Sequence, residues 1–141
     1  GSNWAPHLIH KETWNNIDGF SKEFNPGTGS DPDLNMKLWQ YGVRIFKGLS
    51  KFKVYHFGSI TLRKKKNFLS NKGSKMFLKK WKITPNFFIR HYLKGGVISN
   101  NKIISKKYDG PLNLPKKDLT YLLGLIKCYI KLLYLIMSKN S

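Results

Sequence analysis

The chain has 141 residues, of which 40% are apolar and 14% aromatic, and it carries 26 Lys and Arg against 7 Asp and Glu. This composition excludes a disordered chain and provides a core for one domain, or for part of one. Cys128 is the single cysteine, which excludes an intrachain disulfide, and no run of histidines and cysteines suggests a structural metal site.

The net positive charge is confined to one part of the chain. Residues 1–50 hold five basic and five acidic residues, whereas residues 51–141 hold 21 basic and two acidic residues, so the whole excess of +19 lies in the second part. We therefore expect an anionic partner there, whose chemistry would be that of phosphates, nucleic acid or a lipid surface.

The first predicted elements are short. Residues 4–10, "WAPHLIH", are apolar and favour a strand or a buried turn. Residues 11–17 predict a single helical turn, which closes at Asp18-Gly19. Residues 21–30 combine Asn-Pro with two glycines, which is typical of a loop.

A helix is predicted over residues 32–41. Ser30 or Asp31 is expected to cap it, the proline fits its first position, and Gly42 fits just past its end. Asp31 and Asp33 would both lie at its N-terminus, where acids stabilise the helix dipole by about 0.3–1 kcal/mol. A purely structural role for both acids is therefore one interpretation.

The middle of the chain predicts strands and then helices. Residues 43–48 and 51–59 have strand-like content, with Val, Ile and Tyr. Residues 67–94 predict a helix in two pieces, broken at Thr84-Pro85, and residues 95–117 are rich in Gly, Asn, Lys and Pro and predict a linker.

Residues 118–139 predict an amphipathic helix. At 100° per residue, its small and polar residues fall on one narrow face: Thr120, Gly124, Lys127, Lys131, Tyr134 and Ser138. The apolar run is at the lower limit of the roughly 20 residues that cross a bilayer. Two central lysines would each cost about 2.5–3.5 kcal/mol there, so a helix lying at the membrane surface is the better interpretation. Packing onto its own domain is the alternative.

Several stretches occur in the order of a known family pattern. The stretches "LIHKETW", "DGF", "GSDPDL", "LWQYG" and "VYHFGS" follow one another within residues 3–59, and "KMFLKKW" follows more loosely. In this order they resemble the second half of family 2 glycosyltransferases, inverting enzymes with a GT-A fold. The resemblance implies an α/β fold in which the second half of a GT-A (nucleotide-diphospho-sugar transferase) fold is followed by helices and an amphipathic C-terminal helix.

The resemblance also implies a reaction and roles for the two acids. Family members transfer a sugar with inversion from a nucleotide-diphospho-sugar to a hydroxyl of a polysaccharide, glycolipid or glycan. The family's general base matches Asp31, and Asp33 is the next matched acid, which would orient the helix N-terminus or bind the acceptor. Ser30 departs from the usual acid at its position, which leaves open whether Asp31 acts alone.

A divalent cation is implied as well. His56 matches the family histidine that helps to bind the metal or the diphosphate, and an imidazole ligand suits Mn²⁺ better than Mg²⁺. The remaining metal ligands would belong to the Asp-x-Asp motif of the fold's first half, which this chain lacks. A core histidine at a strand end is the alternative for His56.

Basic and aromatic residues complete the candidate site. Arg63 and Lys64, in the basic run 63–66, are candidates for binding phosphate, although such a run is often only solvated. Trp14 and Trp4 are candidates for stacking on the acceptor sugar, although aromatic residues more often belong to the core.

We expect three segments: residues 1–94 as the C-terminal part of a transferase domain, residues 95–117 as a linker, and residues 118–141 as a membrane-surface helix. The N-terminal half of the fold would have to be supplied from outside this chain, and the chain alone should not turn over a nucleotide sugar. The basic second part favours a place at the inner face of the cytoplasmic membrane, where the chain would meet anionic lipid and a glycan or lipid-linked acceptor.

Two rival functions fit the composition. A basic nucleic-acid-binding module would explain the charge of +19, but no nucleic-acid-binding motif is present and the organised motifs lie in the neutral part, so we expect no nucleic acid partner. The second rival function is that of a membrane-surface adaptor derived from a transferase remnant. The sugar, the nucleotide, the acceptor and the linkage cannot be deduced from the sequence.

Overall fold

The computed structural model of the chain describes residues 6–25, 27–44, 46, 55, 71–93, 97–99, 102–104 and 114–138. Most of these residues are helical. The helical elements are α1 (Lys11–Asn16), a 3₁₀ turn (Lys22–Phe24), α2 (Ser30–Tyr41), α4 (Asn71–Trp81), α5 (Pro85–Phe88), a π-helical turn (Ile89–Leu93) and α6 (Leu119–Met137).

The expected α/β fold, a partial GT-A fold, is wrong for the part of the chain that the structure describes. The strands described there are β1 (Val97–Ser99) and β2 (Lys102–Ile104), an antiparallel pair in which Val97 faces Ile104. Both lie within residues 95–117, which the sequence predicted as a linker. A parallel sheet with helices on its faces would require several longer strands.

The predicted N-terminal strands have another role. Residues 6–10 and 43–44 have irregular backbone, and most of residues 51–59 lie outside the described residues. Ile9, Val43 and Phe46 instead pack against a small core of Ile17, Leu34 and Leu38, between α1 and α2. These apolar side chains therefore pack against a helix and do not form a sheet.

The helix around the two acids is confirmed, but it begins two residues earlier than predicted. Gly29, whose φ of 83° is in the left-handed region, occupies the position before α2. Ser30 makes no cap of the predicted kind, because its Oγ donates to the carbonyl oxygen of Gly27 at 2.7 Å. The predicted end is confirmed, since Gly42 follows the helix with φ 112°.

The break at Thr84-Pro85 is also confirmed. Thr84 is the N-cap of α5, and its Oγ1 accepts a hydrogen bond from the backbone N–H of Phe87 at 3.2 Å. Pro85 is the first helical residue, where its missing N–H needs no partner. The chain therefore turns sharply between α4 and α5.

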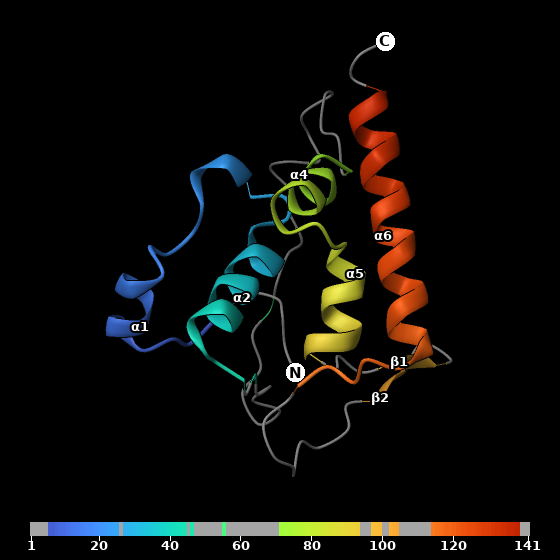
Figure 1. Ribbon diagram of the computed structural model, residues 1–141. Coiled ribbons are helices and arrows are strands. Elements are labelled where there is room, and N and C mark those ends of the chain that lie inside the picture. Colours follow the sequence, from blue (N-terminus) through green and yellow to red (C-terminus); the bar gives the residue numbers. More distant parts are fainter. Residues whose placement is uncertain are drawn as a thin grey trace.

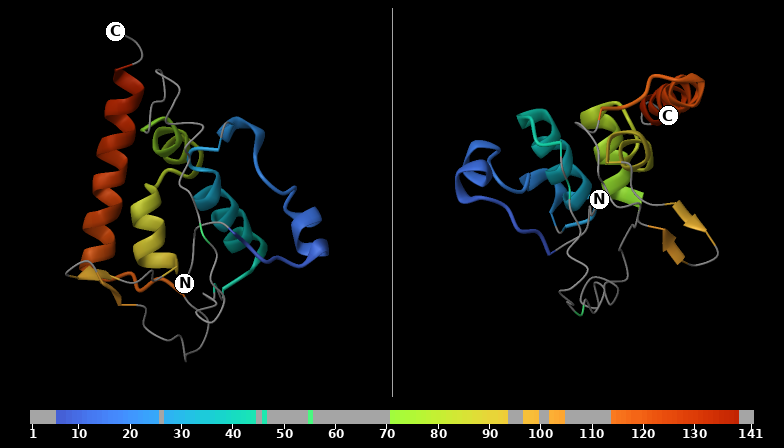
Figure 2. Two further views of the ribbon diagram at one scale, coloured as in Figure 1. Left: turned by 180° about the vertical axis from the view of Figure 1, so that it is seen from behind. Right: turned by 90° about the horizontal axis from the view of Figure 1, so that it is seen from below.

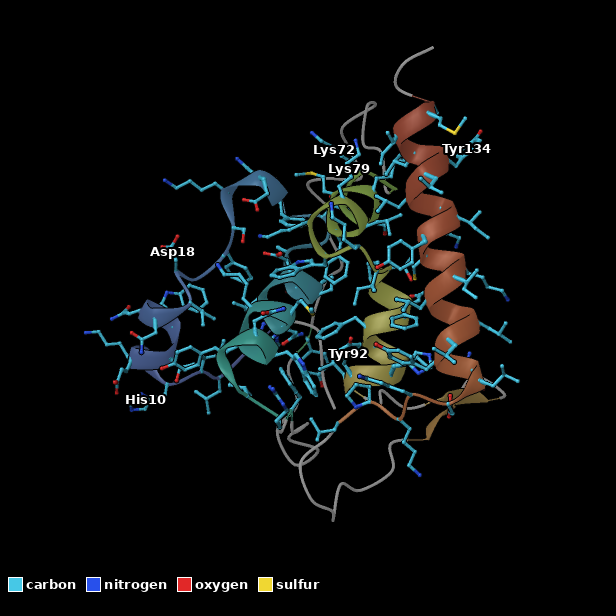
Figure 3. All side chains as sticks on the ribbon, in the orientation of Figure 1. His10, Asp18, Lys72, Lys79, Tyr92 and Tyr134 are labelled. Carbon is cyan, nitrogen blue, oxygen red and sulfur yellow. The ribbon has the colours of Figure 1, made fainter. Side chains whose placement is uncertain are left out.

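The helices lie side by side in the order α1, α2, α4 with α5, and α6, so that α1 and α6 are on opposite sides of the molecule (Figures 1 and 2). The larger core lies between α2, α4, α5 and α6. It includes Phe77, Phe88, Trp39 and Leu132. Figure 3 shows Tyr92 in the space between α2 and α5, and its ring lies 5.2 Å from that of Trp39, edge to face.

The C-terminal helix uses only part of its circumference for this packing. Tyr121, Cys128 and Leu132 of α6 are buried against the larger core, at spacings of seven and four residues. Tyr134 is 75% exposed and points away from the other helices (Figure 3). Among the described helices, α6 is the one that is long and apolar enough to cross a membrane, a test that core helices also pass.

Candidate functional site

The N-terminus of α2 is fixed by a close approach of two backbone segments. A Cβ on Gly73 of α4 would lie 2.1 Å from the carbonyl oxygen of Thr28, and a Cβ on Gly29 would lie 2.9 Å from the carbonyl oxygen of Gly73. Neither position has room for a side chain unless the backbone moves. The first turn of α2 is therefore held directly against the first turn of α4.

Asp33 lies just inside α2 and is completely buried, at 0% exposure. Its Oδ1 accepts hydrogen bonds from Trp81 Nε1 at 2.7 Å and from Lys80 Nζ at 3.0 Å. Its Oδ2 accepts a hydrogen bond from Ser21 Oγ at 2.5 Å. A buried carboxylate needs such partners, and here they come from the end of α4 and from the loop before α2.

A second acid shares Lys80 at the surface. Lys80 Nζ lies 2.7 Å from Oε1 of Glu23, which is largely exposed. The hydrogen bond from Lys80 lowers the pKa of the Glu23 carboxyl. Burial opposes the charge on Lys80, but its hydrogen bonds to Glu23 and Asp33 outweigh this effect and raise its pKa. Lys80 therefore joins a buried carboxylate to an exposed one.

The "DGF" turn is attached to the same helix. Lys37 Nζ of α2 donates to the carbonyl oxygens of Asp18, at 3.1 Å, and of Gly19, at 2.7 Å. Gly19 has φ 43°, and the ring of Trp14 lies 2.5 Å from where a Cβ would be. Only glycine fits this turn, and the turn is bound to α2 through backbone carbonyl groups.

Asp31 lies in the first turn of α2 and is half-buried. Two residues separate it along the helix from the buried Asp33, so the contacts of Asp33 also fix the backbone on which Asp31 stands. The orientation of the helix N-terminus is one of the two roles expected for Asp33, and its complete burial favours this role over acceptor binding. A carboxylate held at this position can accept a proton from a bound hydroxyl group.

A cavity of about 420 Å³ lies beside α1 and is lined by His7, Ile9, Lys11, Trp14 and Phe20. The rings of Trp14 and Phe20 meet edge to face at 5.4 Å. The Nε2 atom of His7 is buried and has no hydrogen-bond partner among the described residues. An aromatic wall with a few polar groups is common in sites that bind small molecules.

The structure does not place this cavity at Asp31. Trp14 contacts Gly19, which is bonded to Lys37, and Lys37 is six residues beyond Asp31 in α2. Six helical residues correspond to a separation of about 9 Å along the axis. Asp31 does not line the cavity, so the cavity and Asp31 are not in contact.

The remaining predicted site residues, Trp4, His56, Arg63 and Lys64, lie outside the described residues. Within the described part of the chain, no three His, Cys, Asp or Glu side chains gather in a way that could hold a metal ion. The divalent cation and its histidine ligand therefore stay predictions.

Sequence reasoning missed the side chains that hold Asp33 in place. Ser21 carries no signal in the sequence, since a serine in a loop is common. Lys80 and Trp81 belong to "KMFLKKW", which resembles a downstream family stretch, and this was the one available signal.

No family model, curated protein or solved structure matches the chain.

Proposed function

We propose that the chain forms the acceptor-side part of an inverting glycosyltransferase that uses a nucleotide-diphospho-sugar. The supporting observation is the contact between Asp33 and the Lys80-Trp81 pair. Asp33 and Trp81 are 48 residues apart, and they belong to two stretches that resemble the same family independently, "GSDPDL" and "KMFLKKW". The proposal concerns the reaction only, because the α/β fold that the same resemblance implies is wrong for the described residues.

The proposed reaction is a single displacement at the anomeric carbon of the sugar. A hydroxyl oxygen of the acceptor forms the new bond to that carbon, while the bond from carbon to the diphosphate oxygen breaks and its electron pair leaves with the nucleoside diphosphate. Asp31 takes the proton of the attacking hydroxyl. Asp33, Lys80 and Trp81 act as positioning residues, because they hold the first turn of α2 in place.

The donor site and the cation are part of the same proposal. The nucleotide sugar would be bound by a segment outside this chain, and a Mn²⁺ or Mg²⁺ ion, when bound, would stabilise the negative charge of the leaving diphosphate. His56 is the proposed ligand that this chain contributes. Since the described residues include no group of three ligands, we assign no step to the ion.

Asp31→Asn in the complete gene product tests the base. We expect nucleoside diphosphate release in the presence of an acceptor glycan to fall at least 100-fold, while the affinity for the nucleotide sugar stays within about twofold. Asp18→Asn is a matched control, because it removes the same charge from an exposed position at which asparagine tolerates the positive φ of 55°. Wild-type turnover by Asp31→Asn would remove Asp31 from the role of base.

We also propose that α6 attaches the chain to the inner face of the cytoplasmic membrane. The support is the exposed apolar surface of α6 together with the positive charge of residues 51–141. A lipid-linked or membrane-proximal acceptor would then lie close to the transferase. Fractionation of cells into membrane and soluble parts, in low and in high salt, tests this localisation, and a wholly soluble protein in low salt would contradict it.

A further inference from the structure

A groove of about 350 Å³ is lined by residues of α5, α6 and the turn after α5. Three basic side chains line it: Arg90 from the turn after α5, and Lys127 and Lys131, one helical turn apart on α6. Thr84, Asn86 and Thr120 add two hydroxyl groups and an amide. Cationic groups and neutral hydrogen-bond donors thus converge on one space.

Arg90, Lys127 and Lys131 have no acidic partner at ion-pair distance among the described residues. His91 lies in the same groove. Burial, and next the charge of Arg90, lower the pKa of His91, while Asp118 acts weakly in the opposite direction. Like charges placed together repel one another, and an anion between them would remove that repulsion.

Gly124 sets the width of the groove. A Cβ there would lie 2.9 Å from the ring of Phe87, so α6 approaches α5 more closely than a larger residue would allow. Glycine inside a helix is less favourable than alanine. Here it brings the lysines of α6 and the arginine beyond α5 to the same opening.

The groove borders an uncovered apolar surface. At 100° per residue, α6 has three sectors: the buried face, a narrow flank that carries Thr120, Lys127 and Lys131, and a broad outer face. The outer face consists of exposed apolar and tyrosine side chains: Leu119, Leu122, Ile126, Ile130, Leu133 and Met137, with Tyr129 and Tyr134 at its edges. The cations therefore lie at the boundary between this face and the body of the protein.

We propose that the groove binds the phosphate-bearing headgroup of an anionic phospholipid, and that the outer face of α6 lies in the adjacent acyl layer. An amphiphile matches both features at once, whereas a soluble phosphate would leave the apolar face uncovered. A second copy of the chain is disfavoured, since each copy carries a net charge of +19. The inference deepens the proposed membrane attachment and is independent of sugar transfer.

The first experiment measures partition of the full chain onto vesicles of phosphatidylcholine with and without phosphatidylglycerol, for the wild type and for Lys127→Gln/Lys131→Gln. Each basic residue near an anionic surface contributes a factor of about 5.5, so the double variant should bind the anionic vesicles about 30-fold more weakly. Glutamine keeps the helix propensity of lysine. Circular dichroism checks the fold of each variant.

Lys116→Gln/Lys117→Gln is the matched control, because it removes two charges from exposed residues just before α6 that do not line the groove. We expect a loss of less than fivefold. An equal loss in both double variants would show attraction by net charge alone and would overturn the headgroup site.

Two further measurements separate the site from its alternatives. Lys127→Arg/Lys131→Arg keeps both charges and should bind anionic vesicles within about threefold of the wild type; a 30-fold loss would overturn the proposal. Titration with inorganic phosphate, followed through the His91 ring by NMR, tests a soluble ligand. Saturable phosphate binding by a protein that ignores anionic vesicles would assign the groove to a small anion and overturn the lipid.

Discussion

Two regions of the molecule differ in how their polar and apolar groups are partnered: the Asp33 cluster between α2 and α4, and the surface of α6. Around Asp33, a buried carboxylate has its hydrogen bonds supplied by Ser21, Lys80 and Trp81. On α6, apolar side chains remain exposed, and Lys127 and Lys131 line a groove without an acidic partner among the described residues.

This contrast indicates which part of the molecule is complete in itself. Burial of a charge is stable only with its partners in place, so the Asp33 cluster contributes to the fold of the chain. An uncovered apolar face beside several cations contributes little to that fold, and it is the kind of surface that binds something else. Substitutions in the Asp33 cluster should therefore lower the stability of the fold, whereas substitutions on the exposed surface of α6 should weaken binding and leave stability nearly unchanged.

The largest expected effect belongs to Asp33→Ala. This change leaves the charge of Lys80 and the indole N–H of Trp81 without their buried acceptor, so we expect the free energy of unfolding to fall by about 3–5 kcal/mol. Urea denaturation measures it. Glu23→Gln removes the exposed partner of the same lysine and should cost less than about 1 kcal/mol. Similar losses of unfolding free energy in the two variants would mean that the buried and the exposed acid contribute equally to stability.

Leu132 and Leu133 separate the two faces of α6 by a single residue. Leu132 is 8% exposed and Leu133 is 59% exposed. Leu132→Ala should cost about 2–5 kcal/mol of unfolding free energy, because it leaves a cavity in the core. Leu133→Ala should change stability by less than about 0.5 kcal/mol but weaken vesicle binding. The comparison would fail if Leu133→Ala were the more destabilising change.

The contact between α2 and α4 can be tested at Gly73. Gly73→Ala would force a methyl group against the carbonyl of Thr28, so we expect a loss of about 1–3 kcal/mol in urea denaturation, despite the better helix propensity of alanine. Ser74→Ala, at the exposed neighbouring position of the same helix, should stay within about 0.5 kcal/mol of the wild type. A Gly73→Ala protein of wild-type stability would show that the two helix starts can separate freely.

The smallest expected effect is a pH dependence in the groove. The pKa of His91 in the folded protein lies below its ordinary value of 6.5, so the unfolded chain takes up a proton first as the pH falls. The contribution of His91 to stability is therefore complete above pH 6.5 and is lost progressively as the pH falls below it. Thermal denaturation between pH 8 and pH 5 should show a shallower decline for His91→Gln; an unchanged slope would exclude His91 as its source.

Local signals in the sequence predicted several helix boundaries well. Gly42 after α2 and Thr84-Pro85 before α5 act through their own backbone geometry, which depends little on distant residues. The start of α2 was misplaced because Ser30, Asp31 and the proline are all good first-turn residues. The positive φ of Gly29 decided the boundary, and a sequence does not display it.

The strand predictions that fall on described residues, near Ile9 and Val43, failed for a different reason. Ile9, Val43 and Phe46 are apolar or β-branched, as strand residues often are. Apolar character predicts that a residue is buried, but it does not predict which element buries it. The same limit applies to α6. Its helical wheel separates the lysine flank from the apolar residues, but it does not say that Leu132 faces the core and Leu133 does not.

The candidate site was predictable only in part. Asp31 and Asp33 stand out as two acids at the start of a helix in a basic chain, whereas their environments differ through tertiary contacts. The partners of Asp33 come from residues 12 and 48 positions away, a separation that no local pattern encodes. The structure distinguishes the two acids by burial, since Asp33 is completely buried and Asp31 is half-buried.

The single cysteine offers a probe of how firmly α6 is attached. Cys128 is 3% exposed, and its sulfur accepts a hydrogen bond from the backbone N–H of Thr84 at 3.4 Å. Because Cys128 is largely covered at the base of the groove, a thiol reagent should react with it faster when α6 separates from α5. The rate of thiol labelling therefore reports how often α6 separates from α5 in the native protein. Labelling would become slower if a bilayer held the helix against its own domain. It would become faster if the helix left the domain to enter the bilayer.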